Sequence, residues 1–248
     1  MERTYVVSNF TVIPLNGTLI QFENGTQFKG MEVSSDVNIS VTVFICNGGD
    51  LTEGFLALPI SALGSRCTAA SYTPFYSFSS EILVAGVEND TDVFLSTVID
   101  GKTNSNQTVR LQKFETYQFK SDNDVSGSKI TSNKPIAVFS GSSDAKVPVE
   151  IGDYQYLVEQ MIPTKHWATK FIIPPIYPRR HFVLKIFADH DSSEVHFNSS
   201  TNHSVVYMNK GSITELSFGK DPVVVSSSKP ISVIQYGHNG DNMYGDPF

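Results

Sequence analysis

The sequence predicts an all-β protein, made of antiparallel β-sandwich-like units in about three tandem repeats packed into one assembly. Apolar and polar residues alternate in short runs bounded by Gly, Asn, Asp and Ser, the pattern of strands joined by turns. Apolar residues at helical spacing are nearly absent. A motif of polar residues, Lys-Pro and alternating apolar residues also recurs along the chain. Such recurrence indicates a repeat architecture.

The repeated motif reads SNKPIAVF at Ser132–Phe139 and SSKPISVI at Ser227–Ile234, with a weaker copy, SDVNISVT, at Ser35–Thr42. The copies begin at positions 35, 132 and 227, so they lie 97 and 95 residues apart. Proline is tolerated at the first position of a strand or at a sheet edge, where its missing N–H removes no ladder hydrogen bond. Each copy therefore predicts a polar turn followed by the start of a strand.

Two further segments recur around this motif. Residues 84–95 and 186–197 each read as strand, polar Asx turn and strand, and they predict two β-hairpins. Residues 58–64 and 162–168 each contain an apolar–Pro step, followed by a large apolar residue that we expect in the core. In the second copy that residue is the only tryptophan of the chain.

The recurring segments divide the chain into three predicted β repeat units. Their boundaries are 1–72, 73–178 and 179–248. Relative to the complete second unit, the first lacks a leading strand and the third lacks the apolar–Pro segment. The three units together would form one region.

Composition excludes several classes of protein. Hydrophobic residues make up 40% of the chain, enough for a sizeable core. The formal net charge of −7 argues against a nucleic-acid partner, because nucleic-acid binding needs a basic face. The sequence has no run of about 18 apolar residues, so we expect no membrane insertion in this segment.

N-glycosylation sequons are unusually frequent and favour a secreted or cell-surface protein. Eight of the fifteen asparagines lie in Asn-x-Ser/Thr, more than the Ser and Thr content would give by chance. An occupied sequon requires a surface position in a secreted protein. The alternative is a Ser/Thr-rich chain that never meets the glycosylation machinery. The candidate glycosylation sites are Asn9, Asn16, Asn24, Asn38, Asn89, Asn106, Asn198 and Asn202.

The two cysteines, Cys46 and Cys67, fit one disulfide that closes a short loop. A loop of about 20 residues would contribute about 3 kcal/mol in the chain-entropy model. Two free buried thiols, or pairing with a cysteine outside this segment, are the alternatives. Neither cysteine has a CxxC partner, so zinc and redox sites find no support.

No catalytic signature is present, and we expect a protein that is not an enzyme and needs no metal or cofactor. The sequence has no GxSxG, HExxH or phosphate-binding loop. Gly141–Asp144 contains serine and aspartate but no positioned histidine. The histidines show no metal-ligand spacing, with His190 expected in a turn and His196 in a strand. The six are His166, His181, His190, His196, His203 and His238.

Two irregular segments are the candidate binding loops, because binding residues concentrate on loops held by a rigid scaffold. The first spans Ser140–Tyr154, and the second spans Gly237–Gly245. The candidate binding residues in them are Ser142, Asp144, Tyr154, His238, Asp241 and Tyr244.

The ordered motifs SNKPIAVFSG, LVEQMIP, FIIPP, SSKPISVIQYG and GDPF resemble the N-terminal domain of the IgG Fc-binding protein family. The resemblance extends from about Leu51 to Phe248. It implies an extracellular, non-catalytic interaction or structural module, because family members are large secreted, mucus-associated proteins. Relatives often have a cysteine pair near Ala145 and Asp153, which this chain lacks. Fc binding belongs to particular members and is not carried over.

The leading hypothesis is an extracellular glycoprotein module for adhesion, mucus or matrix assembly, or recognition of a protein or glycoprotein partner. The alternative is a carbohydrate-binding module that presents aromatic side chains to sugars. An enzyme is the third alternative, with least support. The aromatic candidates for sugar binding are Tyr72, Tyr76, Tyr154, Tyr156, Trp167, Tyr177 and Tyr244.

Overall fold

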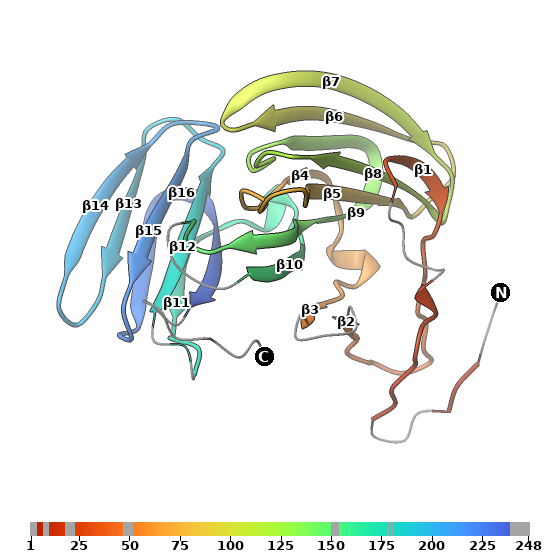
Figure 1. The fold of residues 1–248 in the computed structure, drawn as a ribbon, viewed down its shortest axis with the longest axis horizontal. Coiled ribbons are helices and arrows are strands. Elements are labelled where there is room, and N and C mark those ends of the chain that lie inside the picture. The colour runs from red at the N-terminus through yellow and green to blue at the C-terminus, as the bar shows by residue number, and fades with distance from the viewer. Residues whose placement is uncertain are drawn as a thin grey trace.

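The structure, a computed structural model, confirms the all-β class. It describes residues 4–6, 10–17, 23–46, 52–149, 154–177, 179 and 181–238. Two antiparallel sheets stand side by side, and a small two-stranded sheet lies near the N-terminal segment (Figure 1). Within the described residues the helical segments are short 3₁₀ turns, including Ile60–Ala62 and Thr164–His166.

The larger sheet is organised around one long strand, β9. Its main path runs β1–β8–β5–β9–β6–β7, and β4 and β10 also pair with β9. The first part of β9 pairs with β4 and β6, and its second part pairs with β5 and β10. The sheet therefore curls around its own core (Figure 1). The bounds are β1 Gly25–Phe28, β4 Gly64–Thr68, β5 Ser80–Gly86, β6 Thr91–Ile99, β7 Lys102–Leu111, β8 Glu115–Ser121, β9 Lys129–Lys146 and β10 Tyr154–Gln160.

The second sheet repeats this plan around β16. Its order is β14–β13–β16–β12–β15, and β11 also pairs with β16. The bounds are β11 Ala168–Ile173, β12 His181–Ala188, β13 Ser193–Asn198, β14 His203–Met208, β15 Ile213–Phe218 and β16 Val223–His238. The two-stranded sheet pairs β2, Thr42–Cys46, with β3, Thr52–Leu56. Only the last residue of the weak motif copy at 35–42 lies in a strand.

The Lys-Pro motif lies inside a long strand, so the prediction that it starts a strand is wrong. Pairing of β9 with β6 ends at Ser132, and pairing with β5 begins at Ile136. The β4 register also shifts across this stretch. Pro135 thus sits where β9 passes from one neighbour to the next and no ladder N–H is needed. Pro230 lies at the corresponding point of β16, between its pairing with β13 and with β12.

The two predicted hairpins are also wrong in their pairing. Strands β5 and β6 follow each other through an Asx turn, but β9 lies between them, and β16 lies between β12 and β13 in the same way. The lysine of the Lys-Pro motif helps to hold the long strand between the two consecutive strands. Lys134 Nζ donates to the carbonyl of Asn89 in the first turn, and Lys229 Nζ donates to the carbonyl of Asp191 in the second. A polar turn predicts that the chain reverses direction. It does not predict which strand of the sheet lies between the two strands that the turn connects.

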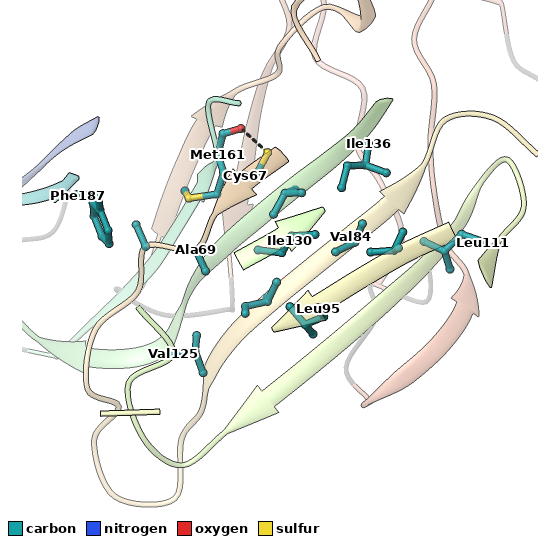
Figure 2. Packing of buried hydrophobic residues seen from close by; sticks show 14 residues of the cluster. Cys67, Ala69, Val84, Leu95, Leu111, Val125, Ile130, Ile136, Met161 and Phe187 are labelled. Carbon is teal, nitrogen blue, oxygen red and sulfur yellow. Dashed lines mark hydrogen bonds between the residues drawn. The ribbon is translucent and has the colours of Figure 1, made fainter. Parts of the chain in front are cut away.

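The core of the larger sheet lies inside its curl (Figure 2). Alternate residues of β5 and β6 are buried, as the sequence alternation predicted. Trp167 packs against this core, also as predicted. Its largest fully buried members include Ile82, Val84, Leu95, Leu111, Ile130 and Ile136.

Strand β12 is buried almost throughout because both of its faces are covered. One face, with Phe182, Leu184 and Ile186, packs into the core of the second sheet. The other face meets the larger sheet, where Phe187 joins the core of that sheet. The two sheets are therefore joined by packing, with β12 at the junction.

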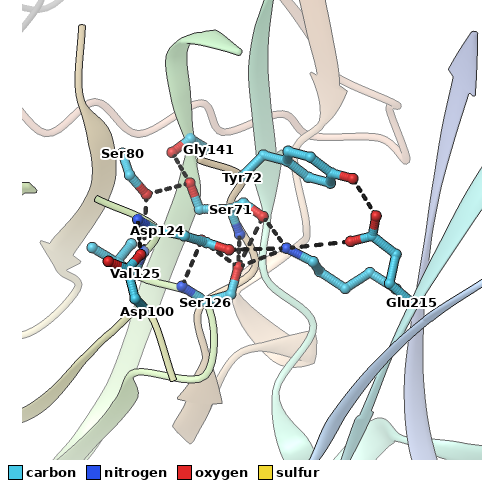
Figure 3. Close-up of polar contacts among 10 residues, drawn as sticks. Ser71, Tyr72, Ser80, Asp100, Asp124, Val125, Ser126, Gly141 and Glu215 are labelled. Atoms are coloured by element: carbon cyan, nitrogen blue, oxygen red, sulfur yellow. Dashed lines mark hydrogen bonds and ion pairs between the residues drawn. The ribbon is translucent and has the colours of Figure 1, made fainter. Parts of the chain in front are cut away.

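A buried lysine also joins the sheets, and Figure 3 labels its partners Ser71, Asp124 and Ser126. Lys185 of β12 is 5% exposed. Its Nζ lies 2.8 Å from the Ser71 carbonyl, 3.1 Å from Asp124 Oδ2 and 3.2 Å from Ser126 Oγ. The ammonium also lies 4.4 Å from the ring centroid of Tyr72. These partners come from segments flanking the larger sheet, so one cation ties the two sheets together.

The boundaries 1–72, 73–178 and 179–248 remain a prediction. The strand near the end of each of the first two predicted units pairs with the long strand of the next unit: β4 with β9, and β11 with β16. Each apolar–Pro segment forms the 3₁₀ turn that leads into that strand. Adjacent units, so defined, would share strands.

Candidate functional site: an aromatic surface cluster

The first candidate loop is largely strand. Residues up to Lys146 belong to β9, and Ser142 and Asp144 are 2% and 5% exposed. The small polar residues suggested a loop, but the structure buries them between strands. Ser142 Oγ donates to the Ser79 and Asp144 carbonyls. The expectation of an exposed loop at Ser142 and Asp144 is therefore wrong.

Tyr154, by contrast, lies in a surface cluster of aromatic residues at the end of β9. The Phe75 ring centroid is 4.3 Å from that of Tyr154 and 4.4 Å from that of Tyr76. Lys146 Nζ lies 4.8 Å from the Tyr154 centroid and 5.1 Å from the Phe75 centroid. We call Phe75, Tyr76, Tyr154 and Lys146 the aromatic cluster.

Backbone pairing fixes the aromatic cluster in place. Lys146 and Tyr154 are cross-strand partners of β9 and β10. The segment carrying Phe75 is held against β9 because Pro74 forms a β-bridge with Ala145 and the Phe75 N–H donates to the Asp144 carbonyl at 2.9 Å. The cluster therefore rests on the rigid end of the long strand.

Tyr76 is the most exposed ring of the aromatic cluster, at 85%. Its φ of +50° is in the left-handed region, which is unfavourable for a bulky side chain. Backbone strain of this kind concentrates at functional sites. Exposed tyrosines next to a cation offer stacking, cation–π and hydrogen-bonding surface, the chemistry of binding hot spots.

A buried carboxyl lies next to the aromatic cluster. Asp144 Oδ1 is buried and, within the described residues, has no hydrogen-bond partner. Burial raises the pKa of Asp144, and a hydrogen bond from the Ala145 N–H opposes the shift. This side chain lies beneath the surface, where a partner on the cluster would not reach it directly.

A groove of about 350 Å³ lies between the β2–β3 pair and β10. Phe44, Phe55 and Leu56 form apolar walls, and Glu53 and Glu159 add two carboxylates. Burial raises the pKa of both glutamates, and their mutual repulsion adds to the shift at Glu53. The groove is thus apolar and acidic.

The other candidate residues are dispersed. His238 ends β16, is 7% exposed and stacks on His181 with ring centroids 5.5 Å apart. Asp241 and Tyr244 lie outside the described residues. Tyr72 is buried and its hydroxyl donates to Glu215. Burial raises the pKa of Tyr156 to about 12.

Every sequon asparagine that the structure describes is exposed. The seven are Asn16, Asn24, Asn38, Asn89, Asn106, Asn198 and Asn202, while Asn9 lies outside the described residues. Asn38 precedes β2 and is not in a strand. Exposure permits a glycan at each position, and occupancy stays a prediction.

The disulfide between Cys46 and Cys67 stays a prediction, and the structure describes the Cys67 thiol alone. Cys67 is a free thiol, 3% exposed, in the core of the larger sheet, and its Sγ faces the Met161 carbonyl at 4.0 Å (Figure 2). Burial raises the pKa of this thiol to about 12. Cys46 ends β2, and its side chain lies outside the described structure. Loop length alone did not reveal that Cys67 faces the core.

Curled antiparallel sheets carrying an aromatic surface cluster define an all-β module with a surface suited to recognition. The chain belongs to the family described as "IgGFc binding protein", whose model matches residues 53–248. The resemblance seen in the sequence is thereby confirmed.

A curated relative, the human IgGFc-binding protein, is 26% identical over 214 residues. The match covers 83% of this chain but 4% of the relative. The chain thus spans only a small part of the length of this relative. In the described residues no helix is long and apolar enough to cross a membrane.

Proposed function

We propose that this chain is an extracellular, non-catalytic module that recognises a protein or glycoprotein partner through the aromatic cluster. Family membership supports the class of function, since the relative is named for binding IgG Fc. The exposed sequons support an extracellular location. Adhesion and mucus or matrix assembly are the settings in which such a module would act.

The aromatic cluster is the observation that carries the assignment of the site. Tyr76 and Tyr154 are 85% and 42% exposed although rings are usually buried, and Lys146 lies over a neighbouring ring. Tyrosine is enriched at the energetic centre of protein interfaces. A partner that covers these rings would remove apolar surface from water while leaving the hydroxyls able to form hydrogen bonds.

The test measures binding of the secreted protein to immobilised human IgG Fc by biolayer interferometry. We expect Tyr76→Ala and Tyr154→Ala each to weaken binding about tenfold or more, as hot-spot truncations do. Tyr207→Ala is the matched control, because Tyr207 is 75% exposed, lies in β14 and belongs to no described aromatic contact. Unchanged binding in both cluster variants would place the site elsewhere. No binding by the wild type would exclude Fc as the partner.

A carbohydrate partner is the second candidate, favoured by the same exposed rings, because tyrosine faces can stack on sugars. A glycan array of the wild type and Tyr76→Ala separates the two candidates. Signals that vanish in the variant would favour the carbohydrate-binding module. An array without signal above background would leave protein recognition as the function.

A further inference from the structure

Two histidines that are seven residues apart in the sequence meet on the β13–β14 hairpin. His196 pairs with Val205, and His203 pairs with Asn198, so the two histidines are diagonal neighbours on one face. His196 Nδ1 and His203 Nε2 are 3.4 Å apart. Their ring centroids are 5.6 Å apart, with the planes tilted by 38°.

A carboxylate lies beside the first of these rings. Glu194 Oε1 lies 2.9 Å from Nε2 of His196. When Nε2–H donates to this carboxylate, Nδ1 of the neutral ring carries the lone pair and points toward His203. A carboxylate on the far nitrogen is the usual partner of a metal-binding histidine, because it fixes the tautomer and raises ligand basicity.

The spacing of the facing nitrogens matches two ligands of one metal ion. Nitrogens that each coordinate a tetrahedral Zn²⁺ at about 2.0–2.1 Å lie about 3.4 Å apart. The side chains of His196 and Glu194 are 36% and 43% exposed, so water has access to the ion. Within the described residues no group of three or more metal-binding side chains forms, so water would complete the coordination.

We propose that His196 and His203 bind one Zn²⁺ ion, with Glu194, whose carboxylate lies 2.9 Å from Nε2 of His196, as the orienting carboxylate. In the metal-free protein the same nitrogens share a hydrogen bond. On zinc binding Nε2 of His203 gives up that proton, and the neutral ring takes the tautomer that is protonated at Nδ1. Imidazole ligands suit late first-row divalent ions, so Ni²⁺ and Cu²⁺ would bind at the same place. Because protons compete with the metal for imidazole nitrogen, binding would weaken as the pH falls.

The test is isothermal titration of the whole secreted protein with ZnCl₂ at pH 7.5. We expect one ion per chain, no saturable binding in His196→Gln or His203→Gln, and about 10–100-fold weaker binding in Glu194→Gln. His190→Gln is the matched control, since His190 lies in the adjoining turn outside the pair. Binding that survives both histidine substitutions, or its absence in the wild type, would overturn the site.

A second measurement guards against variants that fail to fold. Long-range ¹H–¹⁵N spectra of the wild type report each histidine ring nitrogen directly. Zinc should shift the His196 Nδ1 and His203 Nε2 signals together and leave those of His166 unchanged. Shifts confined to other histidines would contradict the proposal.

Discussion

At the scale of single residues, the buried polar side chains were harder to predict from the sequence than the apolar core. The alternating pattern located most of the core, but it did not predict that Lys185 is buried among apolar residues in β12. The uninterrupted apolar run around this lysine was the available signal, because a strand buried on both faces loses its alternation. The partners of the lysine lie far away in the sequence and could not be inferred.

Substituting Lys185 by Met should destabilise the protein strongly. The change leaves the carboxylates of Asp124 and Glu215 without their cation at the junction of the sheets. Breaking a buried pair by removing one partner costs about 3–5 kcal/mol. Urea unfolding checks this, and Lys185→Met combined with Asp124→Asn should recover part of the loss. A single variant as stable as the wild type would contradict a stabilising role for this network.

Glu53 should make stability depend on pH. Its pKa is raised in the folded protein, chiefly by burial, so the folded state binds more protons than the unfolded state between the two pKa values. The stability linked to this group is therefore present below the unfolded pKa and is lost as the pH rises through the folded pKa. Glu53→Gln should be more stable than the wild type at pH 7 and similar to it near pH 4.

Urea unfolding at the two pH values measures this difference. Glu88→Gln is the control, because Glu88 is an exposed glutamate. Equal effects of Glu53→Gln at both pH values would show that ionisation of Glu53 does not matter for stability.

At the scale of elements, the sequence located strands and turns better than it located their partners. Turn chemistry predicted the reversals before β6 and β13, where Asp90 and Ser192 have positive φ. The hairpins were wrong because pairing is decided by a strand from another part of the chain. The Lys-Pro motif was recognised as a repeat. Its lysine and proline, however, lie where the long strand passes from one pairing partner to the next.

Gly141 is required for the pairing of β9 with β10. A Cβ at this position would lie 1.8 Å from the Leu157 carbonyl oxygen, beside the register shift between the two strands. Overpacking against backbone costs about 1–3 kcal/mol or more. We expect Gly141→Ala to lower the free energy of unfolding by about that amount and to disturb Tyr154 at the other end of β10.

Urea unfolding of Gly141→Ala tests this, with Gly219→Ala as the matched control. A Cβ at Gly219 would have nothing within 4 Å. If both variants unfolded alike, the close approach of β9 and β10 would not limit the side chain at 141.

At the scale of the whole molecule, the fold class, the family and part of the candidate site could be predicted from the sequence. Tyr154 was named as a candidate and lies in the aromatic cluster, whereas Phe75 and Lys146 were missed because the three meet only through pairing of β9 with its neighbours. His196 and His203 were missed for the same reason, since a hairpin joins them across seven residues.

The central claim, an extracellular recognition module, is tested most directly by the intact mass of the protein secreted from eukaryotic cells, measured before and after N-glycosidase treatment. The account predicts that several glycans are removed, since seven described sequon asparagines are exposed. Without reduction, the mass should correspond to a free thiol at Cys67. A protein that carries no glycan, or is retained in the cell, would contradict the extracellular assignment.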